Sequence, residues 1–173
     1  SPSYSLDTYK LFEMYDESRG FKTQYWPWGN MGIAMQNPYW IVNRDNFINH
    51  KNRFLFSGGL NYTIAKGITL GARAKMDYAS ALNEKKYSAT TDAIFAQKYG
   101  AYYKDNFNTR QLYGDVMLNI DKYFGDFSVA ATLGASIQDL DNQFYSVGGD
   151  LNSVANLFSL RNLNQSSAKY DQK

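Results

Sequence analysis

The side chains that could take part in chemistry are few in this sequence, and they form no catalytic set. His50 is the only histidine, and a single histidine without partner residues is usually a surface residue. The chain has no cysteine, which excludes disulfides, thiolate metal sites and cysteine nucleophiles. Gly58-Gly59 and Gly148-Gly149 precede no Lys-Ser or Lys-Thr pair and open no helix, so neither is a phosphate-binding loop. We predict that the chain is not an enzyme and holds no cofactor.

One group of oxygen-bearing side chains has a spacing that could suit a metal ion. Asp139, Asp141 and Asn142 could supply oxygen atoms to a calcium ion, which needs six or more of them. Because three residues cannot complete that shell, we interpret this group as an exposed strand end and predict no metal site. The 18 basic and 16 acidic residues form no basic stripe, which excludes a typical nucleic-acid interface.

Two pairs of segments alternate strictly between apolar and polar residues, which is typical of β-strands with one apolar face. The first pair covers residues 53–78 and turns at Ala65-Lys66-Gly67; the second covers 110–138 and turns at Tyr123-Phe124-Gly125-Asp126. Each pair predicts a hairpin. In each strand, the alternate positions that carry mostly polar residues are called the polar parity, and the positions between them the apolar parity. The five charges inside these strands all fall on the polar parity: Arg73, Lys75, Asp77, Asp115 and Asp121. Arg110 and Lys122 fall on the apolar parity, at the predicted strand ends.

The connections between these segments alternate in length. The two turns have three or four residues, whereas residues 79–109 form a link of about thirty. Within this link, Thr91-Asp92 could cap a short helix over 93–99 that ends at Gly100. Residues 1–52 are irregular and aromatic, with a possible strand near 31–35 or 40–43, and residues 139–173 form a further loop with a possible strand. Short turns at one end and long loops at the other are typical of outer-membrane barrels.

Alternation alone does not separate a membrane barrel from a soluble β-sandwich. Strands of about ten residues are long for a soluble protein, and they match the length that a tilted strand needs to cross a bilayer. The polar faces carry many small hydroxyl side chains, which suit a water-filled interior. A closed core formed by four apolar-parity residues would exclude the barrel: Phe54, Leu70, Leu118 and Val129. No apolar run is long enough for a transmembrane helix.

We therefore predict an all-β fold, an antiparallel transmembrane β-barrel segment of about four to six strands with long extracellular loops. Four strands cannot close a barrel, because an open edge in lipid leaves backbone groups without hydrogen bonds. The chain begins at Ser1 without a methionine or a leader, so we expect an excerpt of a larger barrel or one protomer of a composite one. The soluble alternative is a ligand-binding module, for example a carbohydrate-binding one; a passive porin is a third.

Several motifs, in this order and spacing, resemble the SusC/RagA group of TonB-dependent outer-membrane transporters of Bacteroidota. They begin with Asn37-Pro38-Tyr39-Trp40 in a loop and continue with the following segments: Asn52-Arg53-Phe54, Leu60–Ile64 into Ile68–Arg73, Asp115–Asn119, Phe127–Ala135, Leu151–Val154 and Phe158–Asn162. The resemblance covers most of the chain from residue 37 onward. It implies a barrel of twenty-two strands with an N-terminal plug, in the outer membrane of a Gram-negative bacterium.

The resemblance also implies a function and partners. Members of this group import oligosaccharides or oligopeptides, are lidded by a SusD-like surface lipoprotein and receive energy through TonB. The expected partners are thus the rest of the barrel with its plug, the lipoprotein, TonB and outer-membrane lipid. Two sets of candidate site residues follow. Residues that line the lumen would be Arg73, Lys75, Asp77, Gln111, Tyr113, Asp115 and Asn119. Loop aromatics that contact substrate or the lid would be Trp26, Trp28, Tyr39 and Trp40, although these rings could equally pack against one another.

Overall fold

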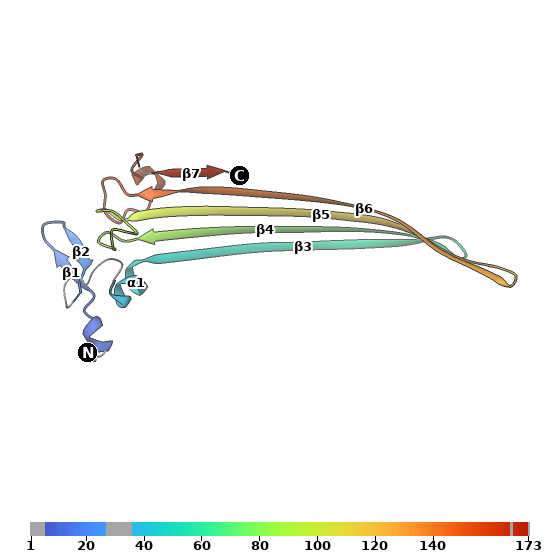
Figure 1. Ribbon diagram of the computed structural model, residues 1–173, viewed down its shortest axis with the longest axis horizontal. Helices are drawn as coiled ribbons and strands as arrows, with labels where there is room; N and C mark the ends of the chain where they lie inside the picture. The colour runs from blue at the N-terminus through green and yellow to red at the C-terminus, as the bar shows by residue number, and fades with distance from the viewer. Residues whose placement is uncertain (1–5, 27–35, 167, 173) are drawn as a thin grey trace. The chain divides into compact units, whose positions relative to one another are not determined.

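A computed structural model describes residues 6–26, 36–166 and 168–172, and these residues are mostly antiparallel β-sheet (Figure 1). The prediction of an all-β antiparallel fold is thus confirmed. The elements in chain order are η1 (Leu6–Tyr9), β1 (Glu13–Asp16), β2 (Phe21–Gln24), α1 (Pro38–Arg44), β3 (Asn46–Ala65), β4 (Ile68–Tyr87), β5 (Ala101–Phe124), β6 (Phe127–Asp150), η2 (Leu160–Asn162) and β7 (Lys169–Gln172).

The strands form two sheets. β1 and β2 pair as an antiparallel hairpin, and the larger sheet has the order β3-β4-β5-β6-β7 (Figure 1). This larger sheet does not close on itself, so β3 and β7 are its edges among the described residues. β7 pairs only with the last part of β6, from Tyr145 to Gly148. The rest of β6 therefore also has one open side within the described part of the chain.

The chain divides into two compact units, which we name by their connections. The loop unit comprises the described residues of Ser1–His50, Leu82–Asn106 and Phe144–Gln172. The turn unit comprises Lys51–Ala81 and Phe107–Gln143, and it contains both short hairpin turns. No helix in the described ranges is both long and apolar enough to span a membrane.

Two-residue turns connect the long strands of the turn unit. Lys66 and Gly67 join β3 to β4, and Gly125 and Asp126 join β5 to β6, so the turns are shorter than the three and four residues predicted. Gly67 has a φ of 75°, a left-handed conformation that glycine adopts without the steric cost of a Cβ. The Asp121 amide of β5 donates a hydrogen bond to the Gly67 carbonyl at 2.7 Å. A larger residue at position 67 would collide with this neighbouring strand.

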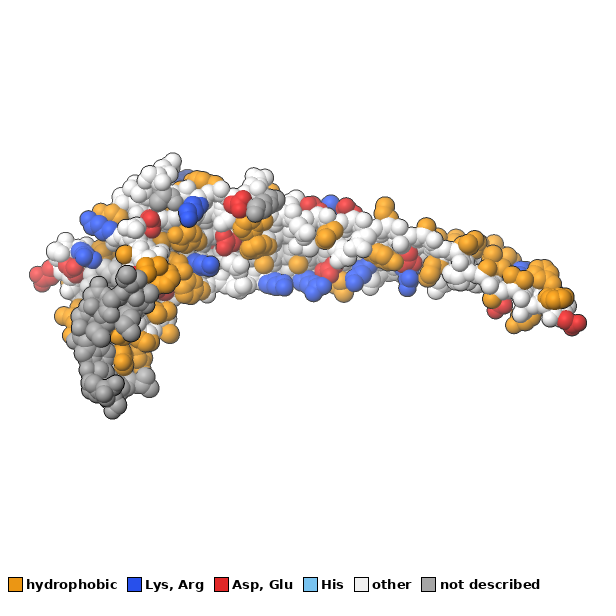
Figure 2. Space-filling view, viewed as in Figure 1, with side chains coloured by type: hydrophobic (Ala, Val, Ile, Leu, Met, Phe, Trp, Pro, Cys, Tyr) orange, Lys and Arg blue, Asp and Glu red, His pale blue; other side chains and the backbone are white. Residues whose placement is uncertain are grey.

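The apolar face of the turn unit lies at the surface. Phe54 is 65% exposed, Leu70 36% and Val129 48%, and Leu118 is half-buried, so these four side chains do not form a closed core. Figure 2 shows apolar side chains at the surface of the sheet near its turns. By contrast, the buried hydrophobic side chains of the described residues all lie in the loop unit: Trp40, Ala89, Ala96, Ala101, Tyr102, Leu151 and Leu163.

The loop unit has a small core of its own. Tyr102, Leu151 and Leu163 are buried together, and Tyr99, Val147 and Phe158 pack against them. An isolated antiparallel bridge joins Leu151 to Leu163 and closes the segment that follows β6. This core stabilises the loops with contacts made inside the unit.

The strands are longer than the alternation predicted. β4 continues to Tyr87, β5 begins at Ala101 and β6 continues to Asp150, so the connection between β4 and β5 is only residues 88–100. The sequence pattern did not reveal these extensions because polar residues occupy both faces there. Arg110, predicted near a strand end, lies well inside β5.

The possible strand over 40–43 was a wrong prediction, because these residues belong to helix α1. Asn37 is the N-cap, and its side chain accepts a hydrogen bond from the Tyr39 amide at 3.0 Å. Pro38 takes the first helical position, where its missing N–H costs nothing. The Asn37-Pro38 pair, expected in a loop, is thus a helix-start signal. The other possible strand, over 31–35, lies outside the described residues.

The predicted helix over 93–99 does not form. Asp92 starts a single turn, because its carbonyl accepts hydrogen bonds from the amides of Phe95 and Ala96. The Gln97 amide, which would continue a helix by donating to the Ala93 carbonyl, donates instead to Asp150 Oδ1 at 3.2 Å. A contact with a distant segment therefore takes the place of the next helical hydrogen bond, and the segment remains a single turn.

Candidate functional site on the polar face of the sheet

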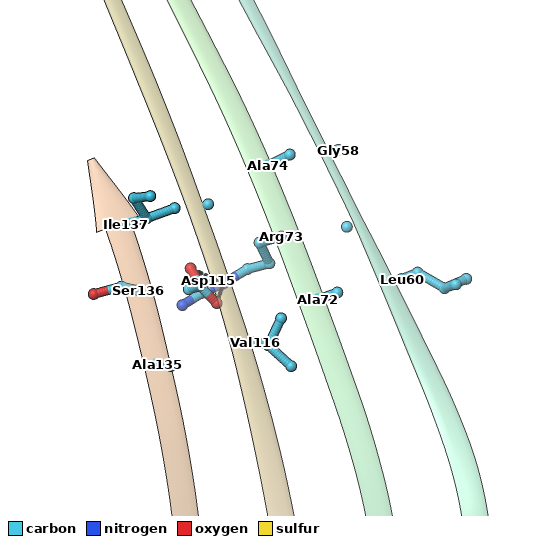
Figure 3. A pocket seen from close by; sticks show the side chains of 12 residues that line it. Gly58, Leu60, Ala72, Arg73, Ala74, Asp115, Val116, Ala135, Ser136 and Ile137 are labelled. Carbon is cyan, nitrogen blue, oxygen red and sulfur yellow. Dashed lines mark hydrogen bonds and ion pairs between the residues drawn. The ribbon is translucent and has the colours of Figure 1, made fainter. Parts of the chain in front are cut away.

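The charged residues of the turn unit pair across neighbouring strands on the polar face. Arg73 of β4 donates from Nε to Asp115 of β5 at 3.0 and 3.1 Å (Figure 3). The Asp115 side chain is only 5% exposed, whereas that of Arg73 is 61% exposed. The carboxylate is therefore held against the sheet, and the guanidinium group keeps surface for another partner.

A second pair links β3 to β4 on the same face. Arg53 donates from Nε and Nη2 to the two carboxylate oxygens of Asp77, at 2.9 and 2.6 Å. This parallel two-bond geometry fixes both side chains. Arg53 was not among the predicted lumen-lining residues. The sequence could have predicted Arg53 as a lumen-lining residue, because it has the same parity as Leu55 and Ser57 on the polar face.

These side chains border a hollow of about 530 Å³ within the turn unit. Its lining from the polar face consists of Ser57, Gly59, Arg73, Lys75, Tyr113 and Asp115. Four of the seven predicted lumen-lining residues thus meet at one place. The opposite face has a hollow of about 690 Å³, where Leu60, Val116 and Ile137 stand beside glycine and alanine residues (Figure 3).

The remaining predicted lumen-lining residues lie on the same face without lining this hollow. Asp77 is held by Arg53, and Asn119 Oδ1 accepts a hydrogen bond from Thr132 Oγ1 at 2.9 Å. Gln111 lies on β5 with the parity of Tyr113 and is half-buried. The structure therefore places all seven on one face of the sheet and brings four of them together.

This arrangement is suited to binding a polar solute. Hydroxyl, amide, ammonium, guanidinium and carboxylate groups alternate along the face, so a solute finds donors and acceptors at short intervals. Within residues 6–26, 36–166 and 168–172, no group of three or more His, Asp or Glu side chains is placed to hold a metal ion. Asp139 and Asp141, considered above for calcium, lie 3.5 and 3.7 Å from Arg110 Nη2, and this cation offsets part of their charge.

The predicted loop aromatics have different environments. Trp26 is half-buried with its ring 5.5 Å from that of Tyr9, and Tyr39 stacks on Phe12 at 6.4 Å. Both rings therefore pack within the loop unit, the alternative that the sequence left open, and their contact with substrate or lid stays a prediction. Trp28 lies outside the described residues.

Trp40 is a packing residue, and a direct contact with substrate is not compatible with its burial. The side chain is 1% exposed, and its Nε1 donates to Thr91 Oγ1 at 3.1 Å. The Thr91 hydroxyl donates in turn to Asp45 Oδ1, which also accepts from the Ser88 amide. Burial raises the pKa of Asp45, although these two hydrogen bonds oppose the rise. This network ties α1 to the segment after β4.

An aromatic cluster that the sequence did not reveal lies in the loop unit. The Tyr87 ring is 5.3 Å from that of Phe47, 5.8 Å from Phe95 and 6.2 Å from Tyr103. Phe47 is 54% and Phe95 38% exposed. Burial raises the pKa values of Tyr87 and Tyr103, with smaller contributions from Asp45 and Asp150. Phe47 of β3, Tyr87 of β4 and Tyr103 of β5 each have the polar parity of their strand. Alternation could have placed them on one face if the strands had been predicted at full length.

Comparison with known proteins does not assign the chain to a family. No protein-family model matches the chain, and no curated protein matches it significantly.

Proposed function

We propose that this chain is part of the wall of an outer-membrane transporter of the SusC/RagA type. The transporter would import oligosaccharides or oligopeptides, with a SusD-like lipoprotein as its lid and energy supplied through TonB. In this proposal the turn unit crosses the outer membrane, and the loop unit is extracellular.

The observation that carries the proposal is the sorting of residues between the two faces of the turn unit. Apolar-parity side chains from four neighbouring strands are at or near the surface, and the ion pairs Arg53–Asp77 and Arg73–Asp115 lie on the opposite face. A charge that faces the bilayer midplane costs about 2–4 kcal/mol, which is a physical reason for such sorting. Because the apolar face has no core to cover it within the described residues, lipid is the medium that best accounts for its composition.

The length of the apolar band supports the same proposal. On the apolar parity, β3 is apolar over 54–64, β4 over 68–78 and β6 over 127–137, and each of these stretches fits the roughly 9–11 residues that a tilted strand needs to cross a bilayer. Directly beyond the band, the same parity becomes polar on every strand: Asn52, Ser80, Arg110 and Asp139. A band with the same end on four strands is what a membrane surface would impose.

The open edges of the sheet support a larger assembly. Beyond the short stretch that pairs with β7, β6 has one open side among the described residues, as β3 does along its length. An open edge in lipid leaves N–H and C=O groups without partners, at a cost of several kcal/mol each. Further strands paired with both edges would remove this cost, and a closed barrel would supply such strands.

The test uses single cysteines in the intact polypeptide that carries this sequence, since the 173 residues contain no cysteine. Ser57→Cys and Ser136→Cys probe the polar face, and Ala72→Cys and Ala135→Cys probe the apolar face. In outer membranes, a fluorophore on the two apolar-face positions should be quenched by nitroxides in the acyl chains. The two polar-face positions should react with a water-soluble maleimide and show no such quenching. Equal aqueous reactivity at all four positions would refute the membrane assignment.

Transport is tested with the same variants. Coupling a bulky maleimide to Ser136→Cys should slow uptake-dependent growth on oligosaccharide or oligopeptide mixtures, because the adduct would occupy the conduit. The adduct on the adjacent Ala135→Cys is the matched control and should leave growth unchanged. Deletion of the gene for TonB should abolish growth on the same mixtures, and growth without TonB would favour a passive porin.

A further inference from the structure

A second hollow, of about 560 Å³, lies within the loop unit and belongs to none of the sites above. Hairpin strand β2, helix α1, strand β4 and the segment after β6 all contribute side chains to it. Its volume is within the range of about 300–1,000 Å³ that small-molecule sites have. The contributions from four segments distant in the sequence make it a cavity defined by tertiary structure.

Among the described residues, basic side chains line this hollow and carboxylates do not. Lys22, Arg44 and Lys86 are among its lining residues. Their carboxylate partners Glu13 and Glu84 have side chains that are only 16% and 17% exposed and do not line it. A ligand that enters the hollow therefore meets positive charge.

Each of these two carboxylates is shared by two basic side chains. Glu13 accepts hydrogen bonds from Lys22 Nζ and Arg44 Nε, both at 2.6 Å. Glu84 lies 3.1 Å from Lys86 Nζ and 4.0 Å from Lys104 Nζ. Four cations thus share two carboxylates, and the nearby Asp45 is 7% exposed and held by Ser88 and Thr91. With Asp45 counted, the sum of these charges is +1, and the excess positive charge comes from Lys104, which does not line the hollow.

The carboxylates also hold the cations in place. Burial raises the pKa of Glu13, but the hydrogen bonds from Lys22 and Arg44 outweigh this effect and keep the pKa below its usual value. The hydrogen bond with Lys86 lowers the pKa of Glu84 in the same way. Both groups are consequently charged near neutral pH, and the basic side chains around them keep fixed positions. Preorganised cations bind an anion at a smaller entropic cost.

The rest of the lining is suited to a sugar ring. Asn43, Asn46 and Asn156 contribute amide groups, which hydrogen-bond hydroxyl groups as both donors and acceptors. The Asn43 side chain is fixed by the bond that its Nδ2 donates to the Tyr39 carbonyl at 2.8 Å. Phe21 and Phe158 add aromatic surface. A ligand with an oxyanion, several hydroxyl groups and an apolar ring face would use all three kinds of side chain.

We propose that this hollow in the loop unit is a binding site for a saccharide unit that carries an oxyanion, such as a carboxylate, sulfate or phosphate. The site goes beyond the proposed transport function and does not depend on it. A free acidic oligosaccharide and the phosphorylated sugars of a membrane glycolipid share this chemistry. An acidic peptide supplies the charge without the ring hydroxyl groups, so it uses the site less well.

The experiment measures binding to the purified intact polypeptide, with no uptake step, so that its result is independent of transport. The probes are trigalacturonic acid, the neutral maltotriose, polyglutamate and vesicles that contain lipopolysaccharide. We expect Lys86→Gln to weaken binding of the acidic saccharide by roughly tenfold, as loss of one charge-assisted hydrogen bond would. Lys85→Gln is the matched control, because it removes the same charge from the other face of β4 and should bind as the unmodified protein does.

A second variant, Lys22→Gln, keeps the test valid if Lys86→Gln fails to fold. Lys22→Gln removes a cation from the exposed β1–β2 hairpin, and its side chain is 56% exposed, so the fold should tolerate the change. Weaker binding of trigalacturonic acid by Lys22→Gln and Lys86→Gln supports the site and identifies a free acidic saccharide. The same losses seen only with lipopolysaccharide vesicles support it and identify a glycolipid. Equal binding by Lys85→Gln and Lys86→Gln, no binding of either acidic saccharide, or preference for polyglutamate would overturn the proposal.

Discussion

The buried side chains of this chain are distributed unequally between its two units. In the loop unit, Tyr102, Leu151 and Leu163 form a core, and Trp40 is buried within a hydrogen-bond network. In the turn unit, large apolar side chains such as Phe54, Leu60 and Leu133 are more than 60% exposed. The loop unit is thus stabilised by its own contacts, whereas the apolar face of the turn unit requires another medium or another chain to cover it.

This difference indicates which features of the sequence specify each unit. A core forms when side chains from distant segments meet, so the loop unit depends on particular residues and their partners. The turn unit depends on a repeated pattern, in which any apolar side chain of suitable size would serve on one face. Substitutions should therefore act through packing in the loop unit and through the sign and face of a charge in the turn unit.

The largest effect is expected for Trp40→Ala, which removes the largest buried side chain of the loop unit. Loss of this packing and of the bond to Thr91 should cost about 3–5 kcal/mol, the usual range for large-to-small changes in a core. Protease cleavage between β4 and β5 would report the loss as faster nicking. Trp40→Phe, which keeps most of the ring, is the control and should be cleaved more slowly. Equal cleavage of both variants and the unmodified protein would show that this packing is dispensable.

A somewhat smaller effect is expected for Ala131→Arg in the turn unit. Ala131 is an exposed residue of β6 on the apolar parity, and a charge there should cost about 2–4 kcal/mol if lipid covers this face. The measurement is the amount of folded protein in outer membranes. Ala130→Arg is the matched control, since it places the same side chain on the polar face one residue away. If both variants accumulate to the same level, water covers both faces and the proposed contrast between the units fails.

The smallest effect is expected for Tyr102→Phe, which deletes one hydrogen bond from the core of the loop unit. The Tyr102 hydroxyl donates to Glu84 Oε1 at 3.0 Å, and its loss should cost about 1 kcal/mol. Near-ultraviolet circular dichroism during thermal unfolding would measure the change at neutral pH.

The same residue predicts a dependence on alkaline pH. Burial, the hydrogen bond to Glu84 and the charge of Glu84 raise the pKa of Tyr102 from 10.0 to about 12. The folded state therefore holds this proton more tightly than the unfolded state does. The stabilisation is complete below pH 10 and is lost as the pH rises from 10 to about 12. Tyr102→Phe should lack this component, so a pH profile of the variant with the same slope as the unmodified protein would contradict the assignment.

The two faces of the turn unit could be predicted from residue types, because a strand places successive side chains on opposite sides whatever surrounds it. Alternation therefore identified both hairpins and the face that carries Arg73, Lys75, Tyr113 and Asp115. It did not identify their pairing, since which residue stands opposite another depends on strand register. Arg53 was overlooked although its parity was visible.

The sequence by itself determined the antiparallel β fold, the turns near Gly67 and Gly125 and the polarity of each face, all of which depend on neighbours in the chain. Only the tertiary structure decided that residues 93–99 are not helical and that Trp40 is buried. Only the tertiary structure, likewise, brought Lys22, Arg44 and Lys86 to one hollow. These outcomes depend on hydrogen bonds and contacts between segments far apart in the sequence, such as Gln97 with Asp150 and Trp40 with Thr91, and no local pattern encodes such pairs.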